Sequence, residues 1–106
     1  MKTPVTVHLL MYDITHEQTL RKVAKLLQQH GYERINYSVW LGWHHPGANT
    51  ELFAGMREML RQKEAKGSRM YHLAMSLSGF KKIKSISGRK PPLLAYWTGE
   101  QKIRFF

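Results

Sequence analysis

The alternation of apolar and polar positions predicts a strand at the start of the chain and a helix after it. In residues 5–14, apolar side chains fall on both faces of an extended strand, which indicates that both faces of its sheet are covered. Thr15 and Gln18 have the spacing of a capping box, so the helix is expected to begin at Thr15. Gly31 is expected to end it in a left-handed conformation. The stripe that this helix buries comprises Leu20, Val23, Ala24 and Leu27.

The middle of the chain repeats this order of strand and helix. Residues 33–43 are rich in β-branched and aromatic side chains and predict a strand, bent into two near residues 37–38. A turn is expected at residues 44–47. A second helix is expected to begin at Asn49 or Thr50 and to end before a glycine-containing turn. Its inward side chains are Leu52, Phe53, Met56, Met59 and Leu60.

The last third of the chain predicts two further strands. Residues 69–77 alternate again between two faces. The basic residues 82–87 form a strand candidate bounded by Gly79 and Gly88. The order of strands and helices therefore predicts an α+β fold, a ferredoxin-like βαββαβ sandwich with an extra C-terminal strand.

The domain organisation follows from the same pattern. At 106 residues, the chain has room for one modest core, which we assign to a single domain over residues 1–90. Residues 91–106 form a C-terminal extension that begins with two prolines and ends in a strand candidate at residues 102–106. Because the first strand is apolar on both faces, a second layer or a second subunit is implied. We expect a sheet-to-sheet homodimer in which this extension docks on the partner subunit.

Positive charge is concentrated in one stretch of the chain. The formal net charge is +10, and residues 61–90 carry nine Lys or Arg against a single acid, Glu64. A one-sided excess of this kind attracts a polyanion, and nucleic acid is the expected partner. The alternative interpretation is a solvated basic face that aids solubility.

Other features of the composition narrow the class of protein. The chain has no cysteine, which excludes disulfides, thiolate chemistry and Cys-based zinc sites and fits a reducing compartment. No apolar run approaches the roughly 18 residues of a membrane span, and the N-terminus lacks the pattern of a signal peptide. We therefore expect a cytoplasmic protein with no membrane partner.

Three linked segments resemble the CRISPR-associated protein two family. They are residues 12–14 (YDI), residues 20–27 (LRKVAKLL) and residues 31–40 (GYERINYSVW). Looser similarity extends to residues 68–71 and 82–88. The resemblance implies a ferredoxin-like fold, a homodimer and a role in spacer acquisition, a step of CRISPR antiviral defence.

The resemblance also implies partners and an activity. In spacer acquisition the dimer bridges dimers of the integrase, CRISPR-associated protein one, and supports incoming duplex DNA. Some relatives are described as magnesium-dependent endonucleases acting on RNA or duplex DNA. The sequence departs from the family pattern at two places, and both lack a carboxylate that the family usually has. Where the family usually has an acid and a thiol, this chain has Trp40-Leu41-Gly42-Trp43. Where further Asp residues are common, it has Thr15 and His16.

Asp13 is the candidate catalytic residue and metal ligand. It lies at the C-terminal end of the first strand, where a carboxylate has no packing role. Mg²⁺ is commonly held by one or two carboxylates together with waters and phosphate, and it can activate water for phosphodiester attack. A twofold axis beside Asp13 would bring two copies together. The alternatives are that Asp13 caps the turn into the helix or pairs with Arg21.

Basic residues in two groups are the candidate nucleic-acid ligands. No base-reading motif accompanies them, so we expect contacts to phosphate that position a duplex without specifying its sequence. The first group lies on the first helix and the second follows residue 80. They are Arg21, Lys22 and Lys25, then Lys81, Lys82, Lys84, Arg89 and Lys90.

Other residues are weaker candidates for catalysis or for stacking on bases. His44 and His45 are adjacent, so they point apart on a strand and fit a two-histidine nuclease poorly; the remaining histidines are expected to be scattered core or surface residues. Ser38 lacks an adjacent base. Phe80 is expected in an exposed loop, where it could stack on bases.

Two rival functions remain open from the sequence. One is a stand-alone endoribonuclease toxin of similar fold, and the other is a small-molecule-sensing regulatory module. Fold alone does not separate them.

Overall fold

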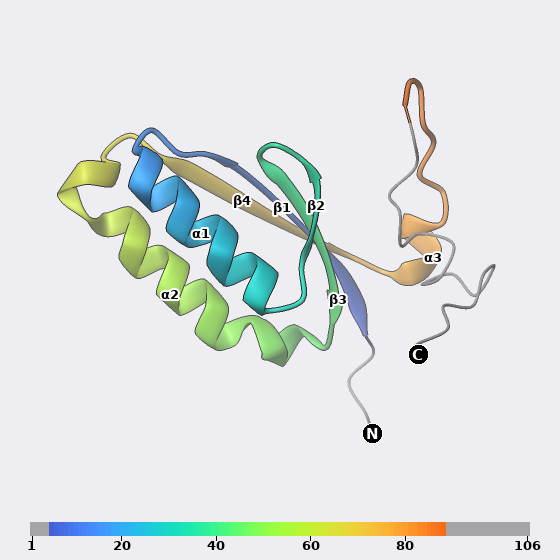
Figure 1. The fold of residues 1–106 in the computed structure, drawn as a ribbon. Helices are drawn as coiled ribbons and strands as arrows, with labels where there is room; N and C mark the ends of the chain where they lie inside the picture. The colour runs from blue at the N-terminus through green and yellow to red at the C-terminus, as the bar shows by residue number, and fades with distance from the viewer. Residues whose placement is uncertain (1–4, 89–106) are drawn as a thin grey trace, which may run out of the picture.

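The computed structural model describes residues 5–88 of the chain (Figure 1). The element order confirms the predicted alternation of strands and helices, with a third, short helix at the end. In chain order the elements are β1 (Thr6–Asp13), α1 (Glu17–Gln29), β2 (Glu33–Asn36), β3 (Val39–His44), η1 (Pro46–Asn49), α2 (Thr50–Arg61), η2 (Lys63–Ala65), β4 (Arg69–Met75) and α3 (Leu77–Phe80).

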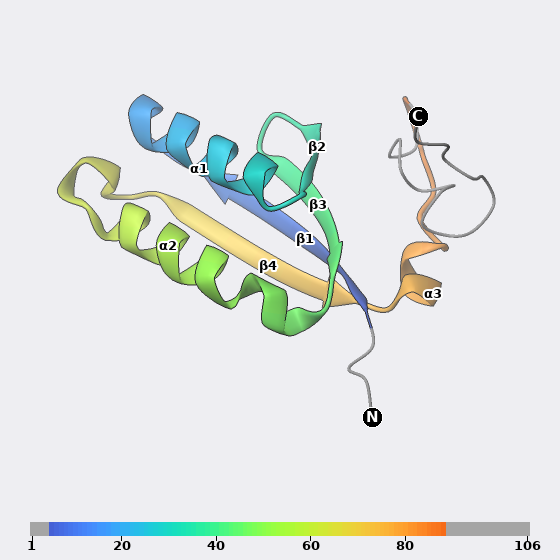
Figure 2. The same cartoon turned by 60° about the horizontal axis from the view of Figure 1, so that its bottom comes forward.

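The four strands form one antiparallel sheet in the order β2-β3-β1-β4. Helices α1 and α2 lie side by side on one face of this sheet (Figures 1 and 2). The antiparallel sheet, with β1 and β3 at its centre and two helices on one face, is compatible with the predicted α+β ferredoxin-like fold. β4 is an edge strand among the described residues, so one side of its backbone pairs with β1 and the other faces outward.

The larger core lies between the sheet and the helices α1 and α2. Leu10 and Tyr12 of β1 are buried here, together with Trp40 of β3. The indole Nε1 of Trp40 donates a hydrogen bond to the hydroxyl of Tyr12 at 2.9 Å, so both aromatic polar groups are satisfied inside the core. The helices contribute Val23, Leu27, Leu52 and Met56.

A smaller core lies on the opposite face of the sheet. Val7 of β1 and Leu41 of β3 are buried against Phe80 of α3. Ser76 caps α3, and its hydroxyl accepts a hydrogen bond from the backbone N–H of Gly79 at 3.1 Å. The short helix therefore covers one end of this face.

The other end of the same face is open in the described residues. Cross-strand partners point to the same side of an antiparallel sheet, and Met11 pairs with Tyr71 while Leu9 pairs with Leu73. Met11, Tyr71 and Leu73 are 38%, 59% and 51% exposed. We call these three residues the open-face patch. β1 is thus apolar on both faces, as predicted, and residues 5–88 of one chain cover its second face only in part.

The predicted start of the first helix is wrong. The N-cap is His16, whose ring Nδ1 accepts from the backbone N–H of Thr19 at 3.3 Å. Thr15 instead ties the β1–α1 loop to the segment before β4: its backbone N–H donates to Ser68 Oγ, and its hydroxyl donates to the Lys66 carbonyl. This tertiary contact replaces the local capping box. The predicted end is confirmed, because Gly31 has a φ of 78°.

The basic strand predicted at residues 82–87 is also wrong. The chain leaves α3 through a hydrogen-bonded turn, and residues 83–88 contain no strand. Phe80 is 2% exposed, so the prediction of an exposed stacking residue fails as well. Both errors have one cause, because burying Phe80 against β1 and β3 requires the chain to turn after β4. The extension at residues 91–106, with its strand candidate, lies outside the described residues.

We predict that Gly42→Ala lowers the free energy of unfolding. A Cβ at this position would come within 2.6 Å of His44 Nε2 and within 2.7 Å of a Tyr32 ring carbon. Overpacking of this kind typically costs about 1–3 kcal/mol. The measurement is urea unfolding, with Gly47→Ala as the control, because a Cβ at Gly47 meets no atom within 4 Å. Equal stability of the two variants would contradict the prediction.

Candidate nucleic-acid interface

Two of the three basic residues of α1, Arg21 and Lys22, lie near acids in the folded protein. Arg21 donates to Glu17 at 2.7 Å, and both side chains are about three-quarters exposed. Such an exposed pair contributes little stability, but it offsets the positive charge locally. Lys22 lines a groove between α1 and α2 that also contains Glu58 and Glu64. The α1 group therefore offers a weaker positive potential than its sequence suggests.

The basic residues that follow α3 are in a different setting. Lys81, Lys82 and Lys84 are exposed, and within residues 5–88 none of them has a carboxylate in salt-bridge distance. Backbone hydrogen bonds from Lys81 to Leu77 and from Lys82 to Gly79 fix the turn in which they begin. We call Lys81–Lys84 the cationic segment.

The two basic groups lie apart in one copy of the chain. Helix α1 lies over the sheet, whereas α3 and the cationic segment lie beyond the end of β4 (Figures 1 and 2). Arg89 and Lys90 of the predicted site lie outside the described residues. The six described residues of the predicted site therefore lie in two separate places, one on α1 and one after α3.

Asp13 is an exposed residue at the end of β1. It pairs with Arg69 in the β1–β4 register and shares the face of Met11. The predicted alternative partner, Arg21, bonds to Glu17 instead. Within the described residues, no group of three or more His, Asp or Glu side chains could hold a metal ion. One copy of the chain therefore supplies a single carboxylate at this position.

The sheet brings His8 and His72, which were expected to be scattered, together with His44. His8 of β1 is 1% exposed, and its Nδ1 lies 2.8 Å from Nε2 of His72 on β4. Its Nε2 lies 2.8 Å from the Thr6 hydroxyl. The ring of His44 on β3 stacks on His8 with centroids 6.0 Å apart. The strand register places these rings together, and no local sequence signal marks the cluster.

Burial lowers the pKa of each histidine in this cluster. For His8 the burial outweighs a hydrogen bond from its ring to the His44 carbonyl, which raises the pKa. For His44 the burial is reinforced by repulsion from His8 and then His30, and for His72 by repulsion from His8. His8 is the most deeply buried of the three side chains, whereas His72 is exposed. A neutral His8–His72 pair needs one donor and one acceptor nitrogen, so protonation of both rings breaks the bond.

The chain belongs to the family described as CRISPR associated protein Cas2, whose profile matches residues 6–78. The match runs from β1 into α3, and it confirms the family that the sequence resembles. The cationic segment lies after the matched part of the chain. No curated protein matches the sequence. Among residues 5–88, no helix is long and apolar enough to cross a membrane.

We predict that the free energy of unfolding falls as the pH is lowered below about 6.5. The unfolded chain takes up protons on its histidines near this value, while the folded cluster resists protonation. The contribution of His8 is therefore fully present above the unfolded pKa and is lost as the pH falls towards the folded pKa. Urea unfolding between about pH 7 and about pH 5 measures this slope.

The variant His8→Gln should flatten the slope, because it removes the buried titrating ring. The control is His45→Gln, which changes an exposed histidine outside the cluster. If His8→Gln leaves the dependence of the free energy of unfolding on pH unchanged, the histidine cluster is not its source.

Proposed function

We propose that the protein is a dimeric DNA-binding scaffold of CRISPR spacer acquisition. In this role it supports duplex DNA and bridges dimers of the integrase, CRISPR-associated protein one. Membership of the Cas2 family supports a CRISPR-related function. The single observation that carries the DNA-binding proposal is the cationic segment, in which three exposed lysines have no carboxylate partner among the described residues.

Phosphate contact is the chemistry that such lysines offer. An ammonium group is a compact, hydrated charge on a flexible stem, which suits phosphate oxygens and does not distinguish bases. Each phosphate that is neutralised releases condensed counterions, so binding of this kind weakens steeply with salt. A scaffold that accepts incoming DNA of any sequence needs these properties.

The dimer is the second part of the proposal. The open-face patch leaves Met11, Tyr71 and Leu73 in water beside the buried Val7 and Leu41. A second copy stacked sheet to sheet would bury the patch in both chains. Residues 91–106, which are rich in apolar side chains, would then dock on the partner. A twofold axis also presents two cationic segments, so one duplex can contact both.

We predict that changing Lys81, Lys82 and Lys84 to Gln weakens binding to duplex DNA. The slope of log K against log salt should become shallower by about 0.9 for each phosphate contact that is lost. Fluorescence anisotropy with a labelled blunt duplex at several salt concentrations measures both quantities.

The matched control replaces the same three lysines by Arg, which keeps the charge. This variant should retain the salt slope of the natural protein. The same titration with duplex RNA compares the two nucleic acids. If the Gln variant leaves the slope of log K against log salt unaltered, the cationic segment does not contact the DNA.

A magnesium-dependent endonuclease activity is a second candidate function. The observation that favours it is the position of Asp13, which shares the face of Met11 and therefore faces the proposed interface between copies. Stacking two sheets about a twofold axis beside this strand end would bring both Asp13 carboxylates to one place. Mg²⁺ held by such a pair could activate water for attack on a phosphodiester.

We predict that Asp13→Asn abolishes magnesium-dependent cleavage, because the amide keeps the shape of the side chain but carries no charge for the cation. Cleavage of a labelled RNA and a labelled duplex is followed with Mg²⁺ and with EDTA. The control is Glu17→Gln, which removes the nearest carboxylate along the chain. Cleavage that persists in a homogeneous Asp13→Asn preparation would show that Asp13 is not the metal ligand.

A further inference from the structure

A pocket lies between α2 and the edge strand β4, on the helix side of the sheet. Its volume is about 320 Å³, near the lower limit of small-molecule sites. Leu10 of β1 and Met56 of α2, both buried, form part of its apolar lining. Two rings, Phe53 and His72, also line it and contact each other edge to face with centroids 4.7 Å apart. The pocket therefore offers an apolar and aromatic interior.

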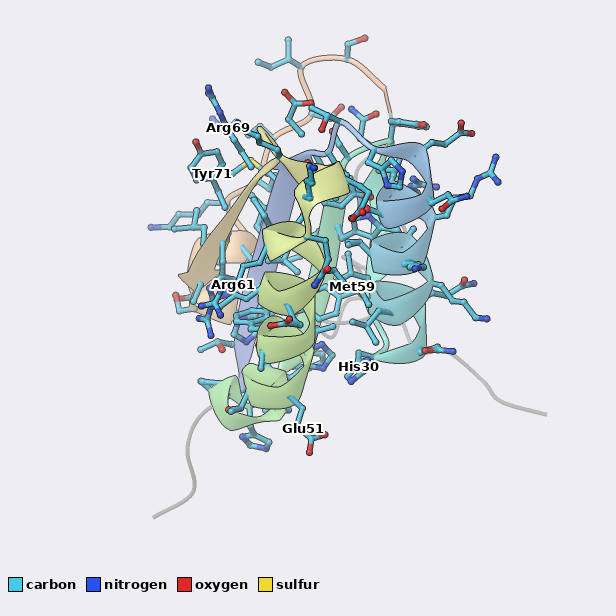
Figure 3. The ribbon with its side chains drawn as sticks, turned by 90° about the vertical axis from the view of Figure 1, so that its left-hand side faces the viewer. His30, Glu51, Met59, Arg61, Arg69 and Tyr71 are labelled. Carbon is cyan, nitrogen blue, oxygen red and sulfur yellow. The ribbon has the colours of Figure 1, made fainter. Side chains whose placement is uncertain are left out.

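Two arginines of α2 line the same pocket. Arg57 and Arg61 are four residues apart, so they lie on one face of the helix. Both are exposed, and within residues 5–88 neither has a carboxylate in salt-bridge distance. Figure 3 shows Arg61 on the side of α2 that faces β4, whereas Met59 lies on the side towards α1. Like charges one turn apart oppose helix formation, so this arrangement favours an anion between them.

The chemistry of the pocket indicates an aromatic anion. Guanidinium groups bind phosphate through paired N–H donors, and apolar and aromatic walls accept the face of a nucleobase. A purely apolar segment would leave both arginines unpaired, and a duplex is too wide for a pocket of this volume. We propose that the pocket binds a single nucleotide, with its base on the apolar and aromatic lining and its phosphate on Arg57 and Arg61.

This site is separate from the proposed duplex-binding surface. The pocket lies between α2 and β4, whereas α3 and the cationic segment lie beyond the end of β4 (Figures 1 and 2). The nucleotide could be free in solution or be the unpaired terminal nucleotide of a strand. The two sources share the same base and phosphate chemistry, and neither requires Lys81, Lys82 or Lys84.

Isothermal titration calorimetry of the full chain with adenosine 5′-monophosphate tests the proposal. We expect adenosine alone and inorganic phosphate alone to bind at least about tenfold more weakly, because each makes only half of the contacts. The double variant Arg57→Gln/Arg61→Gln should lose at least about tenfold in affinity. The matched control Lys63→Gln/Lys66→Gln removes the same charge from exposed positions outside the pocket. Its affinity for adenosine 5′-monophosphate should stay within about twofold of that of the natural protein.

A second titration distinguishes the two sources of nucleotide. If a 5′-phosphorylated duplex with one unpaired terminal nucleotide competes with adenosine 5′-monophosphate and the blunt duplex does not, the pocket takes strand ends. If neither duplex competes, it takes free nucleotides.

Three results would overturn the proposal. They are no binding of adenosine 5′-monophosphate to the full chain, equal binding of inorganic phosphate, and equal loss of affinity in both double variants. The first would result if an apolar segment of a second copy fills the pocket. The phosphate comparison uses the natural protein, so it stands even if the arginine variant fails to fold. The variant Arg57→Gln/Arg61→Gln is also tested for binding to the blunt duplex. Unchanged duplex binding shows that a failure of the nucleotide pocket is not a failure of the duplex-binding proposal.

Discussion

Burial of both faces of β1 is the constraint on which the rest of the structure depends. On the helix side, α1 and α2 bury Leu10 and Tyr12. On the other side, Phe80 of α3 buries Val7 and Leu9 is partly buried beside it, whereas Met11, nearer the other end of the strand, is exposed in the described part of the chain. Apolar burial is the main favourable term in folding and association. A second copy would therefore bury the most exposed apolar surface by packing against the open-face patch.

The same strand connects the candidate sites. Its C-terminal end carries Asp13 on the face of the open patch, and its partner β4 leads into α3 and the cationic segment. Near its N-terminal end, β1 carries His8, whose ring contacts His72 of β4 and the backbone carbonyl of His44 on β3. Acid that protonates both His8 and His72 therefore breaks a side-chain contact between β1 and β4, and β4 also lines the pocket of Arg57 and Arg61.

Regular periodicity allowed most of the fold to be predicted from the sequence. The buried stripe of α1, the left-handed Gly31 and the break between β2 and β3 all depend on neighbouring residues, and the structure confirms them. Helix α3 could not be predicted, because it depends on the burial of Phe80 against residues far away in the sequence. The start of α1 was misplaced for a similar reason, since Thr15 bonds across the fold to Ser68.

The sequence was sufficient to predict which residue types form the candidate nucleic-acid interface, but not how the fold arranges them. The sequence indicates how many lysines and arginines the chain has, and only the fold reveals which of them lie beside acids. Glu58 and Glu64 come from α2 and the segment after it, yet they share a groove with Lys22 of α1. The pocket arginines were missed, although their spacing of four residues beside the inward stripe of α2 was a visible signal.

The central claim is that a second copy covers the open face of the sheet. Sedimentation velocity at micromolar concentration tests it most directly, on the natural protein and on Leu73→Lys, which places a charge in the open-face patch. The control is Ile86→Lys, since Ile86 is an exposed apolar residue in the segment after α3, outside the patch. We expect a dimer for the natural protein and the control, and a folded monomer for Leu73→Lys. A natural protein that sediments as a monomer would contradict the account.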